Sequence, residues 1–221
     1  MIAAEARELA GLAPQLSARR RLPLPIGFAE EGELGGRRWL LGANGAGPRL
    51  AAAAVKAFAR PDRIVSTGYC GALDLALQPS DVVICNRVID ADTNRRFETA
   101  DEFGATCLSG DRFIQTGHEK QMLRQTTGAS VVEMEAAGVA AEAENLGVPF
   151  HCIRVVTDTA GEDMHVDFNS ARDERGRFRL SQIALSALRH PFERIPELLK
   201  LNERARAATA RLGDYLGKHT F

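Results

Sequence analysis

The sequence predicts a single α/β domain with a mixed, mostly parallel central sheet that is flanked by helices. Short apolar segments of strand length alternate with Ala-rich helical segments, and glycine-containing turns separate them. A chain of 221 residues with 45% hydrophobic content is long enough to bury one substantial core. We find no repeat, low-complexity segment or linker, so we expect one domain over residues 1–221, with a helical segment at about 179–221.

Composition excludes several classes of function. The 28 basic and 29 acidic residues nearly cancel, which argues against a nucleic-acid surface. No apolar run reaches membrane-spanning length, and the amino terminus lacks the layout of a secretory signal. The cysteines show no CxxC spacing, so we expect small buried hydrophobes in a reducing compartment, not disulfides or zinc ligands; they are Cys70, Cys85, Cys107 and Cys152. These features favour a cytoplasmic protein without stable membrane insertion.

The first half of the chain begins with helical spacing that stops before Pro14. A strand then runs into a Gly-rich turn, and Pro48 suits the first turn of the helix that follows. A short buried strand, a second turn and another strand come next. The expected elements are a helix over Ala3–Leu12, a strand over Arg37–Leu41, a helix over Arg49–Arg60, and strands over Arg63–Ser66 and Asp81–Ile89.

The second half opens with a polar stretch, Asp90–Phe103, which indicates an exposed excursion or hairpin. Gly147 suits the end of the helix expected over Glu135–Asn145. The polar stretch Thr157–Arg177 is expected to form a loop or lid. The expected strands are Ala105–Ser109, Ala129–Val132 and Val148–Val156, and the expected helices are His118–Gln125, Glu135–Asn145, Arg179–Leu188 and Phe192–Leu216.

Two glycine-rich turns are candidate ligand sites. Gly42–Gly47 has the order GxxGxG with no GK[ST] after it, so neither the dinucleotide nor the P-loop pattern fits. Its free backbone N–H groups suit an anion or a sugar hydroxyl, or it is only a tight turn that needs positive φ. Thr67–Gly71 carries the same two alternatives.

Charged residues at the ends of two apolar strands form the strongest site signal. Glu133 and Glu135 flank Met134 where a strand gives way to a helix, and both acids converge on one pocket if Glu133 ends the strand. The alternative is that they are first-turn acids favoured by the helix dipole. Arg154 lies inside an apolar strand and needs an acid partner or an anionic ligand; a structural ion pair with Asp158 is the alternative to a site.

No metal spacing among the histidines and no GxSxG motif is present, so we assign no metal and no serine nucleophile.

Five ordered segments resemble motifs of the purine nucleoside phosphorylase/uridine phosphorylase superfamily, and especially its nucleosidase-like branch. The resemblance runs from about Arg37 to Leu188 and rests on Gly45-Ala46-Gly47, Thr67-Gly68-Tyr69-Cys70-Gly71-Ala72-Leu73, Ser109-Gly110-Asp111-Arg112-Phe113-Ile114, Val132-Glu133-Met134-Glu135-Ala136 and Arg154-Val155-Val156-Thr157-Asp158. The branch includes methylthioadenosine/S-adenosylhomocysteine nucleosidases and the hopanoid-associated phosphorylase group. The polar stretch 86–97 resembles the latter, which would imply an adenosine-bearing lipid substrate.

The resemblance implies roles for the matched residues. Phe113 would stack on the base and the Ile114 backbone would hydrogen-bond it, while Met134 and Glu135 would hold the ribose. Asp158, oriented by Thr157, would act on purine N7, and Arg154 would help to position the attacking water or phosphate. The further substrate-binding residues expected from the matched motifs are Gly45, Ala46, Tyr69, Cys70, Gly71 and Glu133.

The chain departs from the family pattern in two places. The family usually opens with a full strand before a Glu that activates the nucleophile, whereas only Met1–Ala4 precede Glu5 here. We expect Glu5 to match that acid, with Glu8 as the fallback. The second departure is Tyr69-Cys70, where nucleosidases often carry small or hydroxyl residues.

The resemblance implies cleavage of the N-glycosidic bond of a purine nucleoside, of adenosine type with a 5′ substituent, by water or phosphate. It implies no metal or organic cofactor, inorganic phosphate as a possible co-substrate, and a homo-oligomer (a dimer or larger). A catalytically impaired nucleoside-binding relative is the alternative, because of the short first strand; a protein-interaction scaffold would not explain polar groups in apolar strands.

Overall fold

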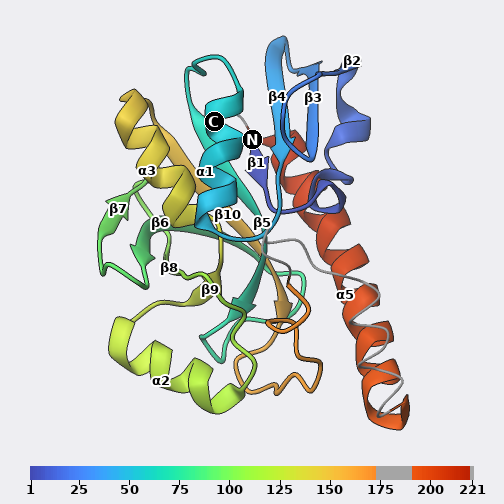
Figure 1. Cartoon of the computed structure of the whole chain (residues 1–221), viewed down its shortest axis with the longest axis vertical. Coiled ribbons are helices and arrows are strands. Elements are labelled where there is room, and N and C mark those ends of the chain that lie inside the picture. Colours follow the sequence, from blue (N-terminus) through green and yellow to red (C-terminus); the bar gives the residue numbers. More distant parts are fainter. Residues whose placement is uncertain (173–190, 220–221) are drawn as a thin grey trace.

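The computed structural model describes residues 1–172 and 191–219 and has the predicted mixed α/β architecture (Figure 1). The strands are β1 Ile2–Ala3, β2 Ser17–Arg21, β3 Phe28–Leu34, β4 Arg37–Ala43, β5 Ile64–Ala72, β6 Val82–Asp90, β7 Arg96–Glu98, β8 Ala105–Ser109, β9 Val131–Glu133 and β10 Phe150–Asp158. The helices are α1 Pro48–Ala57, α2 Gly117–Thr127, α3 Ala136–Leu146 and α5 Pro191–Lys218, with the 3₁₀ turns η1 Ala6–Leu9 and η2 Ala13–Gln15.

The sheet closes on itself at one end. Along it the order is β10-β6-β8-β9-β5-β1-β4-β3-β2, and β10 also pairs with β5. The strands β10, β6, β8, β9 and β5 therefore form a ring, and β1 to β4 extend from it as an open wing. Parallel and antiparallel pairings are equally represented among the described strands, so the expected parallel majority is not found.

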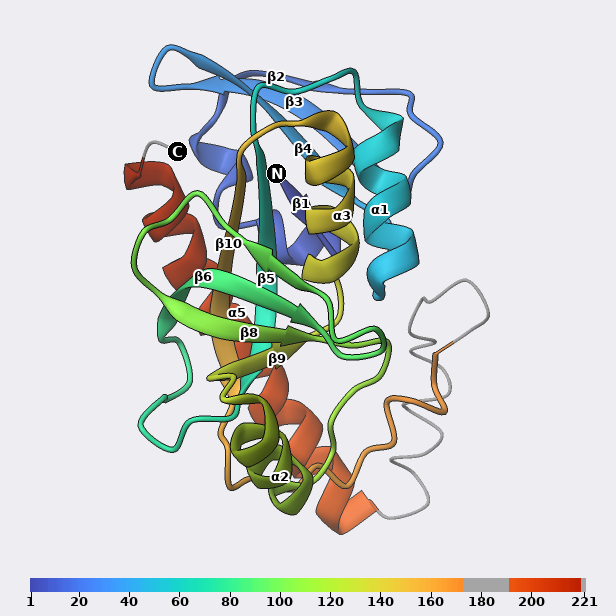
Figure 2. The same ribbon diagram turned by 90° about the vertical axis from the view of Figure 1, so that its left-hand side faces the viewer.

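A hydrophobic core lies on each side of β5 and β10. Helices α1 and α3 pack together on one side, and the long helix α5 packs on the other (Figures 1 and 2). Successive residues of β10 alternate between the two cores: Cys152 faces α1 and α3, and Ile153 faces Leu212 of α5. This alternation explains why β10 is buried along its whole length.

The amino-terminal region differs from the sequence-based expectation. The α-helix expected over Ala3–Leu12 is wrong: Ile2 and Ala3 form β1 between β4 and β5, and only η1 follows as a single 3₁₀ turn. The strands β2 and β3 were not expected, because β2 (Ser-Ala-Arg-Arg-Arg) is exposed throughout and has no apolar alternation.

Most of the remaining elements were predicted correctly, with boundaries that moved by a few residues. The exception is Thr67–Gly71, which continues β5 as strand and is not a turn. Residues 90–98 form the expected hairpin between β6 and β7. Thr157 and Asp158 complete β10, so the expected loop begins at Thr159; its last residues and the helix expected over Arg179–Leu188 lie outside the described residues.

Candidate active site

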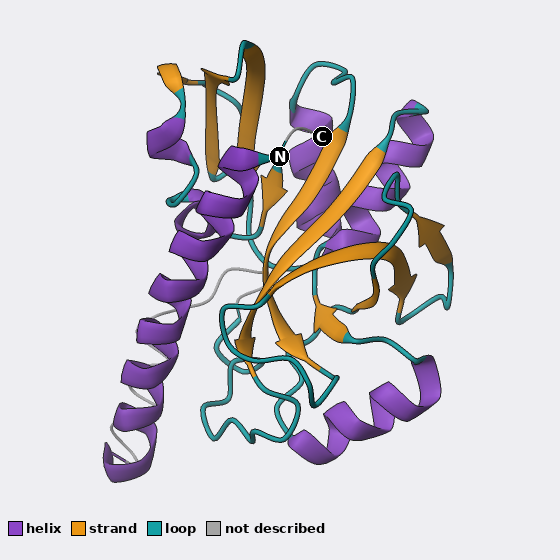
Figure 3. Cartoon of the chain, turned by 180° about the vertical axis from the view of Figure 1, so that it is seen from behind, coloured by secondary structure: helices purple, strands orange, loops and turns teal. Residues whose placement is uncertain are grey.

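A cavity of about 430 Å³ opens at the carboxyl ends of β5, β9 and β10. Figure 3 shows strands that run into loops at this edge of the sheet. Ligands collect at this edge in α/β sheets, because loops and helix starts converge there. Most of the predicted site residues line it, namely Glu5, Ala46, Tyr69, Cys70, Gly71, Phe113, Glu133, Met134, Glu135, Thr157 and Asp158. The structure therefore brings together residues that are up to 153 positions apart in the sequence.

Three predicted residues lie just behind this surface. Gly45 donates its backbone N–H to Ala4 O at 2.8 Å, which ties the Gly-rich turn to the end of β1. The Ile114 side chain packs in a small cluster with Leu73 and Leu108. Arg154 is fully buried beneath the floor of the cavity.

The floor of the cavity is held by a buried ion pair between Arg154 and Glu133. The guanidinium donates from Nε to Glu133 Oε2 at 3.1 Å and also from Nη2 to that atom, and Nη2 donates to Ser66 Oγ at 2.7 Å. The other acceptor sites of Glu133 take the backbone N–H groups of Glu135 and Ala136 at 3.0 Å, so this carboxylate also caps the start of α3. The partner of Arg154 is thus Glu133 and not Asp158.

Glu135 presents the second buried carboxylate. Its Oε1 accepts the backbone N–H of Gly47 at 3.0 Å, which links α3 to the Gly-rich turn. Burial raises the pKa of Glu135 well above its usual range, and the negative charges of Glu133 and Glu8 add to this. Gly47 has φ +114 and lies so close to Arg172 that a Cβ would stand 2.2 Å from its Nη2. Glycine is therefore required at position 47 both by the positive φ and by the close approach of Arg172.

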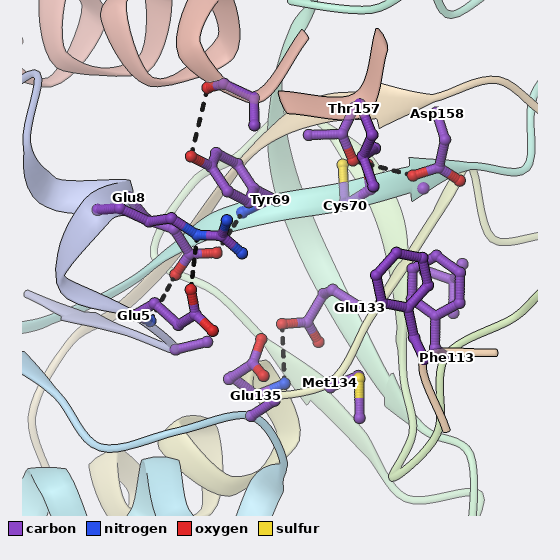
Figure 4. Close-up of a pocket in the computed structure, with 18 of the residues that line it drawn as sticks. Glu5, Glu8, Tyr69, Cys70, Phe113, Glu133, Met134, Glu135, Thr157 and Asp158 are labelled. Atoms are coloured by element: carbon purple, nitrogen blue, oxygen red, sulfur yellow. Dashed lines mark hydrogen bonds and ion pairs between the residues drawn. The ribbon is translucent and has the colours of Figure 1, made fainter. Parts of the chain in front are cut away.

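Glu8, and not Glu5, directs a buried carboxylate into the cavity (Figure 4). Glu8 is 6% exposed, and it accepts the backbone N–H groups of Tyr69 at 3.2 Å and Glu5 at 3.0 Å. A Cβ at Gly68 would lie 3.1 Å from this carboxylate, so glycine makes the close approach possible. Burial raises the pKa of Glu8. Glu5 lines the rim, where its carboxylate pairs with Arg7 at 2.6 Å and its side chain is 33% exposed.

Asp158 lies across the cavity from Glu8 in Figure 4 and is held on both of its oxygens. The Thr157 hydroxyl donates to Oδ1 at 2.9 Å, and the Lys120 ammonium donates to Oδ2 at 2.5 Å. Lys120 is fully buried and escaped the sequence analysis. Its sequence signal is weak: a lysine in the first turn of a helix, where the dipole disfavours a cation.

Aromatic rings form a further wall beside Asp158. Phe113 and Phe168 have their ring centroids 5.0 Å apart. Asn169 fixes the backbone of Phe113 on both sides, since its Oδ1 accepts from Phe113 N at 2.8 Å and its Nδ2 donates to Phe113 O at 2.9 Å. Such a clamp holds a ring in place for stacking on a planar ligand. Sequence reasoning identified Phe113 but missed Phe168 and Asn169.

Helix α5 closes the end of the cavity near η1 and β5, a contribution that sequence reasoning also missed. Its lining residues are Leu198, Leu201, Asn202 and Ala205. Tyr69 bridges to this helix, with its hydroxyl 2.5 Å from Thr209 Oγ1. This end of the cavity is mostly apolar, in contrast to the acidic floor.

The four cysteines are free and buried, as expected. Burial raises the pKa of the Cys70 thiol well above its usual range, so Cys70 contributes a neutral wall to the cavity. The Sγ atoms of Cys85, Cys107 and Cys152 lie within 4.8 Å of one another on β6, β8 and β10, a grouping that their spacing in sequence does not reveal. Three thiols at such distances could serve a soft metal ion, but they lie in the apolar core outside the cavity.

The sequence matches a known protein family over most of its length. Residues 4–105 and 102–189 match the sequence model of the Phosphorylase superfamily. The chain belongs to this superfamily. Among curated proteins it is similar to the 5′-methylthioadenosine/S-adenosylhomocysteine nucleosidase of Staphylococcus epidermidis, with 26% identity over 52% of this chain and 64% of the relative. It is also similar to the aminodeoxyfutalosine nucleosidase of Helicobacter pylori, with 37% identity over 28% of this chain and 27% of the relative.

These sequence matches cover less than two thirds of the length of the curated relatives, so they leave the activity of the whole protein open. The match in three dimensions is more extensive. A solved 5′-methylthioadenosine/S-adenosylhomocysteine nucleosidase from Neisseria meningitidis, in complex with methylthio-immucillin-A, superposes with a TM-score of 0.73 at 24% identity. The superposition covers 98% of this chain and 95% of that one, which confirms the nucleosidase-like fold.

Proposed function

We propose that this chain hydrolyses the N-glycosidic bond of a purine nucleoside, of adenosine type with a 5′ substituent. The observation that carries the proposal is the arrangement of buried carboxyl groups around one cavity: Glu8 and Asp158 lie on opposite sides, and Glu135 lies on the side of Glu8 (Figure 4). Cleavage of this bond builds positive charge on the sugar and negative charge on the leaving base, so the reaction needs acidic groups in both regions.

The base would leave from the side of Asp158. Phe113 offers a clamped ring for stacking, and Asp158 lies at the same wall, where it would deliver a proton to N7 of the purine. A protonated base is a far better leaving group than a purine anion. Phe113 and Asp158 therefore have the same roles here as those that the family resemblance implies.

The sugar and the water would occupy the side of Glu135 and Glu8. Carboxylates beside the ribose stabilise the positive charge that develops on it, and Glu135 would also accept hydrogen bonds from its hydroxyls. Glu8 would take a proton from the attacking water. We prefer Glu8 to the sequence-based choice of Glu5, because Glu8 is buried against Gly68 and Tyr69 whereas Glu5 pairs with Arg7 at the rim.

Charge favours water over phosphate as the nucleophile. At this end of the cavity an ionised Glu8 would repel a phosphate dianion, and the cation Arg7 that lines it is paired with Glu5 at 2.6 Å. The buried cations Arg154 and Lys120 are already engaged by Glu133 and Asp158. The proposed steps therefore call for side chains and water, with no organic cofactor or metal.

The apolar end at α5 supports a nucleoside with an apolar group at its 5′ position. Leu198, Leu201 and Ala205 would contact that group. The similarity to the Staphylococcus epidermidis nucleosidase, which is named for 5′-methylthioadenosine and S-adenosylhomocysteine, supports the same class of substrate. The stretch 86–97 forms the β6–β7 hairpin and lies outside the lining of the cavity, so it gives no support for a lipid-bearing nucleoside.

A panel of purine nucleosides with and without a 5′ substituent, assayed with and without phosphate, tests the proposal. We expect free purine to be released without phosphate, and fastest from an adenosine with a small apolar 5′ group. Thermal stabilisation by nucleosides without turnover would instead support the impaired binder. Catalytic activity is favoured over binding alone, because β1 is formed and Glu8 lines the cavity.

The raised pKa of Glu8 predicts the pH dependence of this activity. A general base must be ionised, so kcat/KM should be full above the raised pKa of Glu8 and fall as the pH drops through it. Activity should therefore be lost at a higher pH than that of an ordinary glutamate. Glu5 and Arg154 also act on Glu8 through their charges, so the profile reports the cluster. A profile that stays flat down to the ordinary glutamate range would contradict the assignment.

The proposal includes a homo-oligomer, a dimer or larger, that acts in the cytoplasm. The nearly balanced charge and the buried free thiols support the location. Within residues 1–172 and 191–219, no helix is long and apolar enough to cross a membrane. Sedimentation of the purified chain would test the assembly.

A further inference from the structure

The environment of Lys120 points to a role in the reaction. Its side chain is fully buried, and its Nζ lies 2.5 Å from Asp158 Oδ2 and 2.7 Å from Thr159 O. It stands behind Asp158, outside the lining of the cavity. An ammonium that has left water needs strong compensation, which here comes from a carboxylate of the proposed active site.

The position of Lys120 on its helix also needs an explanation. It lies in the first turn of α2, where the helix dipole disfavours a positive charge. Helix α2 begins a few residues after Phe113, so one short segment carries both the ring for the base and the ammonium behind Asp158. This arrangement places Lys120 next to the group that would act on the leaving base.

The hydrogen bonds of Asp158 raise the question of where its proton comes from. Both of its oxygens accept, Oδ1 from the Thr157 hydroxyl and Oδ2 from Lys120. A carboxylate that accepts on both oxygens has no proton of its own to give to a base. Of its two donors, the ammonium is by far the stronger acid.

We propose that Lys120 positions Asp158 and supplies the proton that Asp158 passes to the leaving base, an inference that rests on the proposed hydrolase function. The Nζ–H bond of Lys120 breaks as an O–H bond forms on Asp158. That carboxyl then gives its proton to purine N7 while the C1′–N9 bond breaks and its electron pair moves to the base. Lys120 is left as a neutral amine and regains a proton from water after the purine departs.

A purely structural ion pair would be the simpler role, and α2 offers a matched control for it. The same helix is anchored by a second ion pair, Arg124 with Asp74 at 2.7 Å, which lies away from the cavity. Arg124→Met should loosen α2 without touching Asp158. A loss that is specific to Lys120 would therefore reflect its link to Asp158.

The deciding experiment compares two substrates that differ only at N7: an adenosine-type nucleoside and its N7-methylated cation, which needs no proton to leave. With Lys120→Met we expect kcat on the ordinary nucleoside to fall by about 10²–10³-fold, with KM changed by no more than about threefold. On the N7-methylated nucleoside, kcat should stay within about threefold of the unaltered protein. Asp158→Asn should behave in the same way, and Arg124→Met should affect neither substrate.

The inference is overturned if Lys120→Met keeps its rate on the ordinary nucleoside, or loses the same factor on both substrates. If the unaltered protein cleaves no purine nucleoside, the proposed function itself fails, so the two failures are distinguishable. Circular dichroism and the Tm of each variant establish that it is folded.

Chemical rescue gives a second test that does not depend on acceptance of the methylated substrate. The cavity left by Lys120→Ala should admit methylammonium, which carries N–H groups, and added methylammonium should restore kcat in proportion to its concentration. Tetramethylammonium carries the same charge without a proton and should not restore it. Equal rescue by both ions, or rescue by neither, would overturn proton supply by Lys120.

Discussion

Replacing Glu8 by Gln is expected to lower kcat by about 10³-fold, because general-base assistance contributes about 10²–10⁴-fold. The amide keeps the size of the side chain and its contacts with Tyr69 and Gly68, but it cannot take a proton from water. The measurement is steady-state release of the purine, and KM should change little because Glu8 would act on the water and not on the base.

Glu5→Gln is the matched control for this prediction. Glu5 lies three residues away on the same segment, at the rim of the cavity, with its carboxylate on Arg7. We expect its replacement to change kcat by less than about threefold. A large loss with Glu5→Gln and a small one with Glu8→Gln would restore the assignment that the sequence alone suggests.

Replacing Arg154 by Met is expected to lower the free energy of unfolding by about 3–5 kcal/mol, the usual cost of removing one partner of a buried ion pair. Glu133 would remain buried with an uncompensated charge, since its side chain is 1% exposed. Urea unfolding followed by circular dichroism measures the loss. The start of α3 should weaken as well, because Glu133 also accepts the backbone N–H of Ala136.

The double variant Arg154→Met/Glu133→Gln separates the cost of the unpaired charge from the loss of packing. It should be more stable than Arg154→Met alone, since no buried charge is left without a partner. The exposed pair Arg87–Glu98 provides the contrast, and Arg87→Met should have a far smaller effect. Equal losses from Arg87→Met and Arg154→Met would contradict this account of the buried pair.

The carboxyl-terminal half of the sheet could be predicted from sequence because its strands are continuous apolar runs. In β10, charge enters only at Arg154 and Asp158, which identified both the strand and the site. The prediction failed for β2, whose exposed arginines show no alternation. That strand is stabilised by ion pairs with its neighbour β3, such as Arg19 with Glu30 at 2.5 Å. Such pairing depends on a partner strand and leaves no periodic signal.

The candidate site could be predicted where a motif meets a strand end, and not where it depends on packing. Glu133 and Asp158 end strands and Glu135 follows one, and all three were identified directly. The choice between Glu5 and Glu8 needed the geometry of η1, because a 3₁₀ turn and an α-helix direct side chains differently. Lys120 and the α5 lining approach from distant segments, so only the folded chain reveals them.

The fate of the water oxygen distinguishes hydrolysis from phosphorolysis. The reaction should be run in ¹⁸O-labelled water with phosphate present, and the sugar product analysed by mass spectrometry. If water is the nucleophile, the product is a free sugar that carries one labelled oxygen at C1 and forms at the same rate with or without phosphate. A sugar 1-phosphate without the label, formed only when phosphate is added, would contradict hydrolysis.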